Sequence, residues 1–98
     1  MDNYATIPQT ISEQQIAPNT LNVWGEVANL NLTFAAAIDT IVNEYAFVFS
    51  SGATPTVLTL PSNVKWMNGT ALEIKANKKY LVSVIYDGTD YLAIGGEF

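Results

Sequence analysis

The sequence predicts an all-β fold, an antiparallel β-sandwich or jelly roll of about eight short strands with an extended N-terminal arm. Short runs alternate apolar and polar residues with the period of two that a pleated strand imposes. Turn residues such as Asn-Gly and Asp-Gly punctuate these runs at regular intervals. One run, residues 45–49, is apolar on both of its faces.

Residues 44–61 predict a hairpin at the centre of a sheet, because they contain two strand-like runs joined by small residues. Tyr45, Phe47 and Phe49 share one face of the first run, and the alanine and valine between them occupy the other. A strand that is apolar on both faces is covered on both sides. We therefore expect a second layer or a second subunit over its other face.

Residues 1–20 are polar and irregular, and we expect them to form an arm outside a single β-sandwich domain at residues 21–98. This arm contains at most one short strand. A short helix is the alternative, since Ser12 and Gln15 have the spacing of a capping box. The segment before Pro18 is too short and has too few apolar residues for such a helix to be stable alone.

The remaining strands follow from alternation and turn residues. Residues 21–27 and 30–34 predict two strands joined by a tight antiparallel turn at Ala28-Asn29. Residues 35–43 are expected to form a loop that crosses between sheets. Asn68-Gly69 and Asp87-Gly88 predict hairpin turns, because glycine and asparagine tolerate positive φ. The strands beside these two turns are predicted at residues 64–67, 70–75, 80–86 and 91–94.

Composition favours an oligomer without nucleic-acid or membrane partners. Of the 98 residues 49% are hydrophobic and 13% are charged, about half the usual charged share, so some surface must be covered by a partner. The net charge of −5 and the absence of arginine argue against binding to phosphate backbones. The apolar runs are far shorter than the roughly 20 residues that a spanning helix needs.

The sequence predicts no catalytic residue, no cofactor and no metal site. Histidine and cysteine are absent, which excludes Ser-His-Asp and Cys-His arrangements within the chain. Residues 87–90 (DGTD) resemble part of a calcium loop, but a hairpin turn explains the Asp-Gly pair fully. An enzyme with a scattered carboxylate pair is the least favoured hypothesis.

Aromatic residues are the candidate interface, because tryptophan and tyrosine are enriched at the centres of binding surfaces. Trp24 occupies the otherwise polar side of its run, as a partly covered surface ring or as an interface anchor. Aromatic residues beside turns can also stack on sugar rings, which keeps a carbohydrate-binding tip open. The candidates are Trp24, Tyr45, Phe47, Trp66, Tyr86 and Tyr91.

Several segments together resemble a small β-module of structural proteins in tailed bacteriophages. Residues 43–52 (NEYAFVFSSG) and 58–61 (LTLP) are followed by VKW at 64–66, Asn68-Gly69 and ANKKY at 76–80. The resemblance covers roughly residues 20–96 and ends in a strand followed by Gly95-Gly96. It implies no catalytic residues.

The resemblance implies a non-enzymatic virion structural protein, assembled in the cytoplasm of a bacterial host. Proteins of this appearance occur as trimeric capsid decoration proteins, head fibres and tail or baseplate tips. A chain of 98 residues that begins with Met1 lacks a long fibre shaft, which favours a decoration or head-fibre protein. The expected partners are two further copies and the major capsid protein or another virion protein. The alternative is a receptor- or carbohydrate-binding tip that contacts a host surface glycan.

Overall fold

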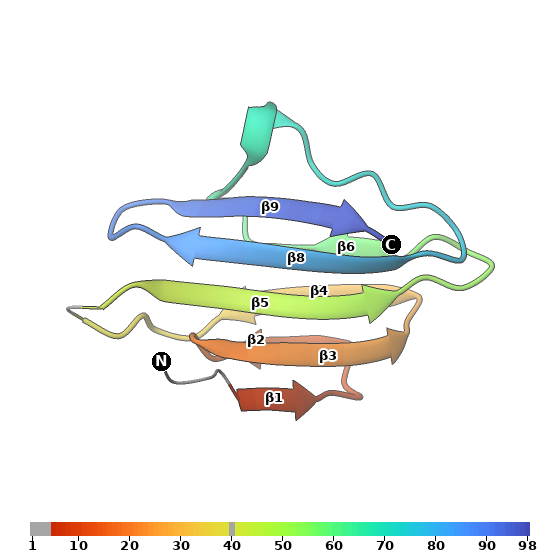
Figure 1. The fold of residues 1–98 in the computed structure, drawn as a ribbon, viewed down its shortest axis with the longest axis horizontal. Helices are drawn as coiled ribbons and strands as arrows, with labels where there is room; N and C mark the ends of the chain where they lie inside the picture. The colour runs from red at the N-terminus through yellow and green to blue at the C-terminus, as the bar shows by residue number, and fades with distance from the viewer. Residues whose placement is uncertain (1–4, 40) are drawn as a thin grey trace.

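The computed structural model describes residues 5–39 and 41–98, which fold into two stacked β-sheets (Figure 1). Sheet A has the strand order β1-β3-β5-β8-β9-β7, and sheet B has the order β2-β4-β6. The strands of sheet A are β1 (Ala5–Pro8), β3 (Thr20–Glu26), β5 (Asn43–Ser50), β7 (Val64–Trp66), β8 (Lys79–Tyr86) and β9 (Tyr91–Glu97). Those of sheet B are β2 (Glu13–Ile16), β4 (Asn29–Phe34) and β6 (Val57–Thr59). A short 3₁₀ turn, η1, spans Met67–Gly69.

The first six strands wind as a flattened coil. The chain places β1, β3 and β5 in sheet A and β2, β4 and β6 in sheet B, so that it changes sheet after every strand (Figure 1). Each of the strands β1 to β4 then pairs in parallel with the strand two places later in the chain. This is the arrangement of a short β-solenoid, in which every turn stacks on its neighbour. The antiparallel hairpin β8–β9 extends sheet A beyond β5, and β7 pairs in parallel with β9.

The predicted all-β fold is confirmed, but within residues 5–39 and 41–98 antiparallel pairing is found only at β5–β8 and β8–β9. The hairpins predicted at Ala28-Asn29 and within residues 44–61 are wrong, because the strands that flank each connection lie in different sheets. Such strands face one another through their side chains and bond through their backbones to other turns of the coil. The alternation of apolar and polar residues is the same whether two strands form a hairpin or lie in facing sheets.

The turn predictions near the C-terminus are confirmed in part. Asp87-Gly88 connects the antiparallel pair β8–β9, and Gly88 has φ 98°. Asn68 and Gly69 also have positive φ, 62° and 69°. Residues 70–75, however, form no strand, so this turn does not close a hairpin.

Within residues 5–20, the chain is part of the two-sheet body rather than a separate arm. β1 pairs with β3 over four residues, and β2 pairs with β4 over four more. Ile16 is almost completely buried in the core. The helix considered at Ser12 is not formed, since Glu13–Ile16 is a strand.

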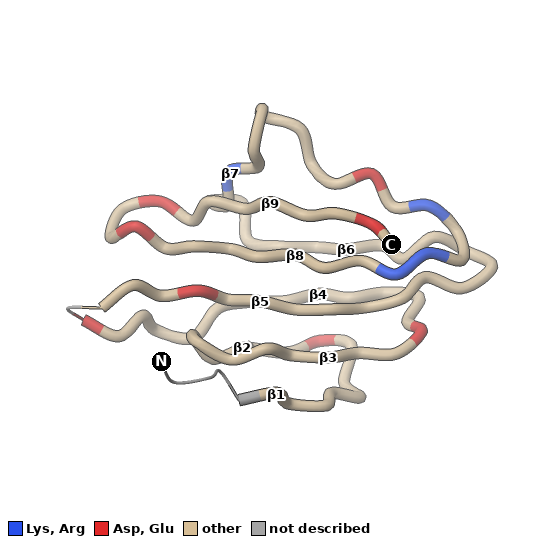
Figure 2. Tube along the Cα trace, in the orientation of Figure 1, with Lys and Arg blue, Asp and Glu red and all other residues tan. Residues whose placement is uncertain are grey.

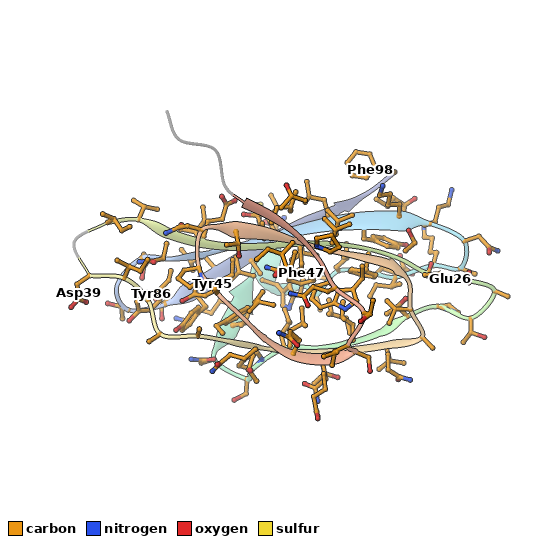
Figure 3. All side chains as sticks on the ribbon, turned by 90° about the horizontal axis from the view of Figure 1, so that it is seen from below. Glu26, Asp39, Tyr45, Phe47, Tyr86 and Phe98 are labelled. Atoms are coloured by element: carbon orange, nitrogen blue, oxygen red, sulfur yellow. The ribbon has the colours of Figure 1, made fainter. Side chains whose placement is uncertain are left out.

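The core lies between the sheets and is built from the inner faces of β5 and β8. Tyr45, Phe47 and Phe49 alternate inward along β5, and Figure 3 shows the first two between the layers. The buried side chains that complete this core are Ile16, Trp24, Leu30, Leu32, Tyr80, Val82, Val84 and Ala93.

A polar residue, Asn22, also points into the core and is 1% exposed. Its Oδ1 accepts a hydrogen bond from Gln9 Nε2 at 3.0 Å, and its Nδ2 donates to the Ala46 carbonyl at 3.3 Å. The side chain therefore links three successive turns of the coil, and its polar atoms are satisfied as burial requires.

Candidate interaction surface

The side of sheet A that faces away from sheet B is a candidate interaction surface, called here the outer face of sheet A. Because side chains alternate along a strand, the inward Tyr45 and Phe47 place Ala46 and Val48 on this face. The pairing register sets Leu81 beside Val48. The apolar members of the face are Leu21, Val23, Ala46, Val48, Leu81, Ile85, Leu92, Ile94 and Phe98.

This face is open to solvent in the single chain. Leu81, Ile85, Leu92 and Ile94 are between 38% and 48% exposed, and Phe98 stands outside the sheet (Figure 3). A shallow hollow of about 300 Å³ lies along β8 and β9 on this side. Scattered exposed apolar residues are normal on proteins, whereas a contiguous set marks an interaction site.

The outer face of sheet B has the opposite character, although its strands alternate in the same way. Its exposed side chains are mostly amides, hydroxyls and a carboxylate, and Asn31 Nδ2 donates to Glu13 Oε2 at 3.4 Å. Val57 is an isolated apolar residue there, 60% exposed. The residues of this face are Glu13, Gln15, Asn29, Asn31, Thr33, Val57 and Thr59. The apolar outer face of sheet A is therefore a property of its sequence and not of the fold alone.

Charged groups lie at the two ends of the outer face of sheet A. Glu44 is the second residue of β5 and lies at one end, where its carboxylate accepts a hydrogen bond from the Ser83 hydroxyl. Lys79 begins β8 at the other end and pairs in register with Ser50. All four lysines of the chain fall within residues 65–79, which Figure 2 shows around β7 and the start of β8.

Four aromatic rings cluster between the sheets at the end of the body where β8 leads into β9. Tyr91 stacks on Tyr86 at 4.5 Å and on Phe34 at 5.2 Å between ring centroids. Tyr45 contacts Phe34 at 4.7 Å, and its hydroxyl donates to the Ala35 carbonyl at 2.6 Å. Burial, followed by the nearby phenols of Tyr91 and Tyr86, raises the pKa of Tyr45. Rings that stack on one another leave less of their faces for a sugar.

The structure places the six candidate interface residues mainly inside the body. Trp24, Tyr45 and Phe47 are at most 3% exposed, so they stabilise the fold and offer no surface to a partner. The Trp24 indole nitrogen donates to the Ile11 carbonyl at 2.9 Å, which ties the β1–β2 connection to β3. The other three, Trp66, Tyr86 and Tyr91, are partly buried against the core.

Sequence reasoning missed the aliphatic residues of β8 and β9. The available signal was the run at residues 80–86, in which Leu81 and Ile85 lie opposite the inward tyrosines and valines. The same signal, an apolar second face, was recognised in β5.

The acidic turn at residues 87–90 is a hydrogen-bonded hairpin turn. Asp87 Oδ1 accepts hydrogen bonds from the backbone of Asp90 at 2.6 Å and of Thr89 at 2.9 Å. These two bonds lower the pKa of Asp87. Within residues 5–39 and 41–98, no group of three or more acidic, histidine or cysteine side chains could hold a metal ion.

Comparison with protein-family models, with curated proteins and with solved structures finds no significant match. The resemblance to bacteriophage modules therefore depends on the residues quoted for it above. No helix in the described part of the chain is long and apolar enough to cross a membrane.

Proposed function

We propose that this chain is a non-enzymatic structural protein of a tailed-bacteriophage virion, a capsid decoration or head-fibre protein that assembles through the outer face of sheet A. The observation that carries the proposal is the contrast between the apolar outer face of sheet A and the polar outer face of sheet B. The virion context comes from the sequence resemblance, which also suggests a trimer.

Self-association accounts for the low charge of the chain. Covering apolar surface contributes roughly 25 cal/mol per Å² and is the main favourable term in association. A partner over the outer face of sheet A would also give β5 the second cover that its two apolar faces require. We describe the fold as a β-sandwich, because two sheets face each other, although the connections between its strands form a coil.

The polar outer face of sheet B remains accessible in such an assembly. Its amide and hydroxyl side chains suit hydrogen bonding to the major capsid protein or to another virion protein. We rank the alternative function, a receptor- or carbohydrate-binding tip, second because Tyr86 and Tyr91 stack on each other. Binding of the purified protein to a glycan array would favour that alternative.

Sedimentation equilibrium of two matched variants tests the assembly. Ile94→Asp places a charge on the outer face of sheet A, and Val57→Asp does the same on sheet B, at residues that are 48% and 60% exposed. We expect the parent protein and Val57→Asp to sediment as one oligomer and Ile94→Asp as a monomer with an unchanged circular dichroism spectrum. A parent protein that is monomeric over the whole concentration range would overturn the proposal.

Immunogold labelling tests the virion context. An antibody raised against the purified chain should label intact particles prepared from the source of this sequence. Absence of the chain from such particles, checked by mass spectrometry, would exclude a virion role even if the protein self-associates.

A further inference from the structure

We propose that a second copy of this chain covers the outer face of sheet A about a symmetry axis that runs across the strands, so that Glu44 of one copy contacts Lys79 of the next. The inference rests on the proposed self-association and adds the geometry of the contact. It is carried by the positions of these two charges at opposite ends of a largely apolar face.

The two charges lie on adjacent strands at opposite ends of the face. β5 and β8 are antiparallel neighbours, and the register pairs Glu44 with Ile85 and Lys79 with Ser50. Ser50 is six positions after Glu44, which corresponds to about 20 Å along the strands at roughly 3.4 Å per residue. Apolar side chains and Ser83 fill the space between the two charges.

Neither charge has an ionic partner within the described residues. The ion pairs found there are Lys65 with Asp90 at 3.1 Å and Lys75 with Glu97 at 4.0 Å. The Glu44 carboxylate accepts a hydrogen bond from the neutral hydroxyl of Ser83. Covering an unpaired charge is costly, so an occupant of this face must supply a positive group at one end and a negative group at the other.

A second copy supplies both groups only in one orientation. With the axis across the strands, the Glu44 end of one copy faces the Lys79 end of the next. The two side chains are then displaced sideways by one strand spacing, about 4.8 Å, which their length can span. With the axis along the strands, the Glu44 ends would face each other, so Glu44 would have no cationic partner. Lys65, the other cation near this face, is already paired with Asp90.

The size of the face is sufficient for such a contact. The four long strands β3, β5, β8 and β9 have seven or eight residues each, which corresponds to about 25 Å, and at about 4.8 Å apart they present roughly 500 Å² per copy. Two copies would bury roughly 1,000 Å² in total, near the lower limit for a specific interface.

Charge reversal tests the contact directly. Glu44→Lys and Lys79→Glu should each weaken self-association on the order of tenfold to a hundredfold, as expected for a close charge pair across an interface. The double variant Glu44→Lys/Lys79→Glu should regain most of the loss, because it restores the pair with its signs exchanged. Glu13→Lys, a reversal on the outer face of sheet B, is the matched control and should leave association unchanged.

The readout is the dissociation constant from sedimentation velocity, with circular dichroism to confirm that each variant is folded. The milder Glu44→Gln and Lys79→Gln substitutions repeat the test if a reversal prevents folding, and each should weaken association about tenfold. Self-association by the parent protein without recovery in the double variant would overturn the axis and leave the proposed function intact. A monomeric parent protein would overturn both.

Discussion

Replacement of Asn22 by alanine should destabilise the protein more than any exposed Asn→Ala change, because Asn22 connects three turns of the coil. The substitution removes the hydrogen bonds with Gln9 Nε2 and with the Ala46 carbonyl, and a third from Nδ2 to the Thr20 hydroxyl at 3.3 Å. At about 1 kcal/mol per buried hydrogen bond, the expected loss in the free energy of unfolding is about 3 kcal/mol. This is a large part of the roughly 5–15 kcal/mol that holds a domain folded.

Thermal and urea unfolding followed by circular dichroism would measure this loss. A change of about 3 kcal/mol corresponds to a fall in Tm of roughly 12–24 °C for a domain of this size. All variants must be compared at one protein concentration, since association also stabilises the folded state. Asn29→Ala, on the exposed face of β4, is the matched control and should change the free energy of unfolding by less than about 0.5 kcal/mol.

A double-mutant cycle with Gln9→Ala tests the pairing of β1 with β3. The hydrogen bond between Gln9 and Asn22 depends on the parallel pairing of β1 with β3. The coupling free energy between the two substitutions should therefore be about 1 kcal/mol. A coupling below about 0.3 kcal/mol, or an effect of Asn22→Ala no larger than that of Asn29→Ala, would refute the reasoning.

Three further predictions follow from individual side chains. Gly95→Ala should lower the free energy of unfolding by about 1–3 kcal/mol in urea titrations, because an added Cβ would lie 3.2 Å from a Val82 methyl group. Gly96→Ala is the control and should have little effect, because a Cβ at that position would meet open space. Tyr45 has a raised pKa in the folded state, so its contribution to stability is complete below about pH 10 and is lost as the pH rises toward that raised pKa. Tyr45→Phe should flatten the alkaline fall in Tm, and an unchanged slope would contradict this assignment. Asp87 has a lowered pKa, so its contribution to stability is present above about pH 4 and is lost as the pH falls through the folded-state pKa. Asp87→Asn should therefore reduce the loss of Tm between about pH 4 and pH 2. Parallel curves of Tm against pH for the variant and the parent protein would argue against this role of the turn.

The sequence was sufficient to predict those parts of the fold that local chemistry decides. Alternation identified β5 and β8, and Asp87-Gly88 identified the turn between β8 and β9. The partners of the other strands could not be predicted in this way. A two-residue connection such as Val27-Ala28 can join hydrogen-bonded neighbours or strands in facing sheets, and the choice depends on segments distant in the chain.

The candidate surface was harder to predict because the two faces of β3 were assigned in reverse. The alternation at residues 21–27 puts Trp24 on the polar side, whereas Asn22 and Trp24 point inward and Leu21 and Val23 point outward. Because Asn22 is polar but buried, the alternation of apolar and polar residues predicts the wrong buried face for β3. The need for a cover over the second face of β5 was recognised, but aromatic residues were expected to provide the contact. In the structure, aliphatic residues of neighbouring strands occupy that face.

The position of β5 has a consequence for the order in which the chain can fold. This strand lies between β3, which precedes it, and β8, which follows it after a long excursion through β6 and β7. The hairpin β8–β9 contains the closest contacts along the chain between paired strands and can close early, since short loops close at little entropic cost. The three turns of the coil are made first during synthesis, yet β5, the last strand that they contribute to sheet A, acquires its second neighbour only when β8 has left the ribosome. Until then one edge of β5 exposes unpaired backbone groups, and the nascent chain must be protected from pairing with other chains.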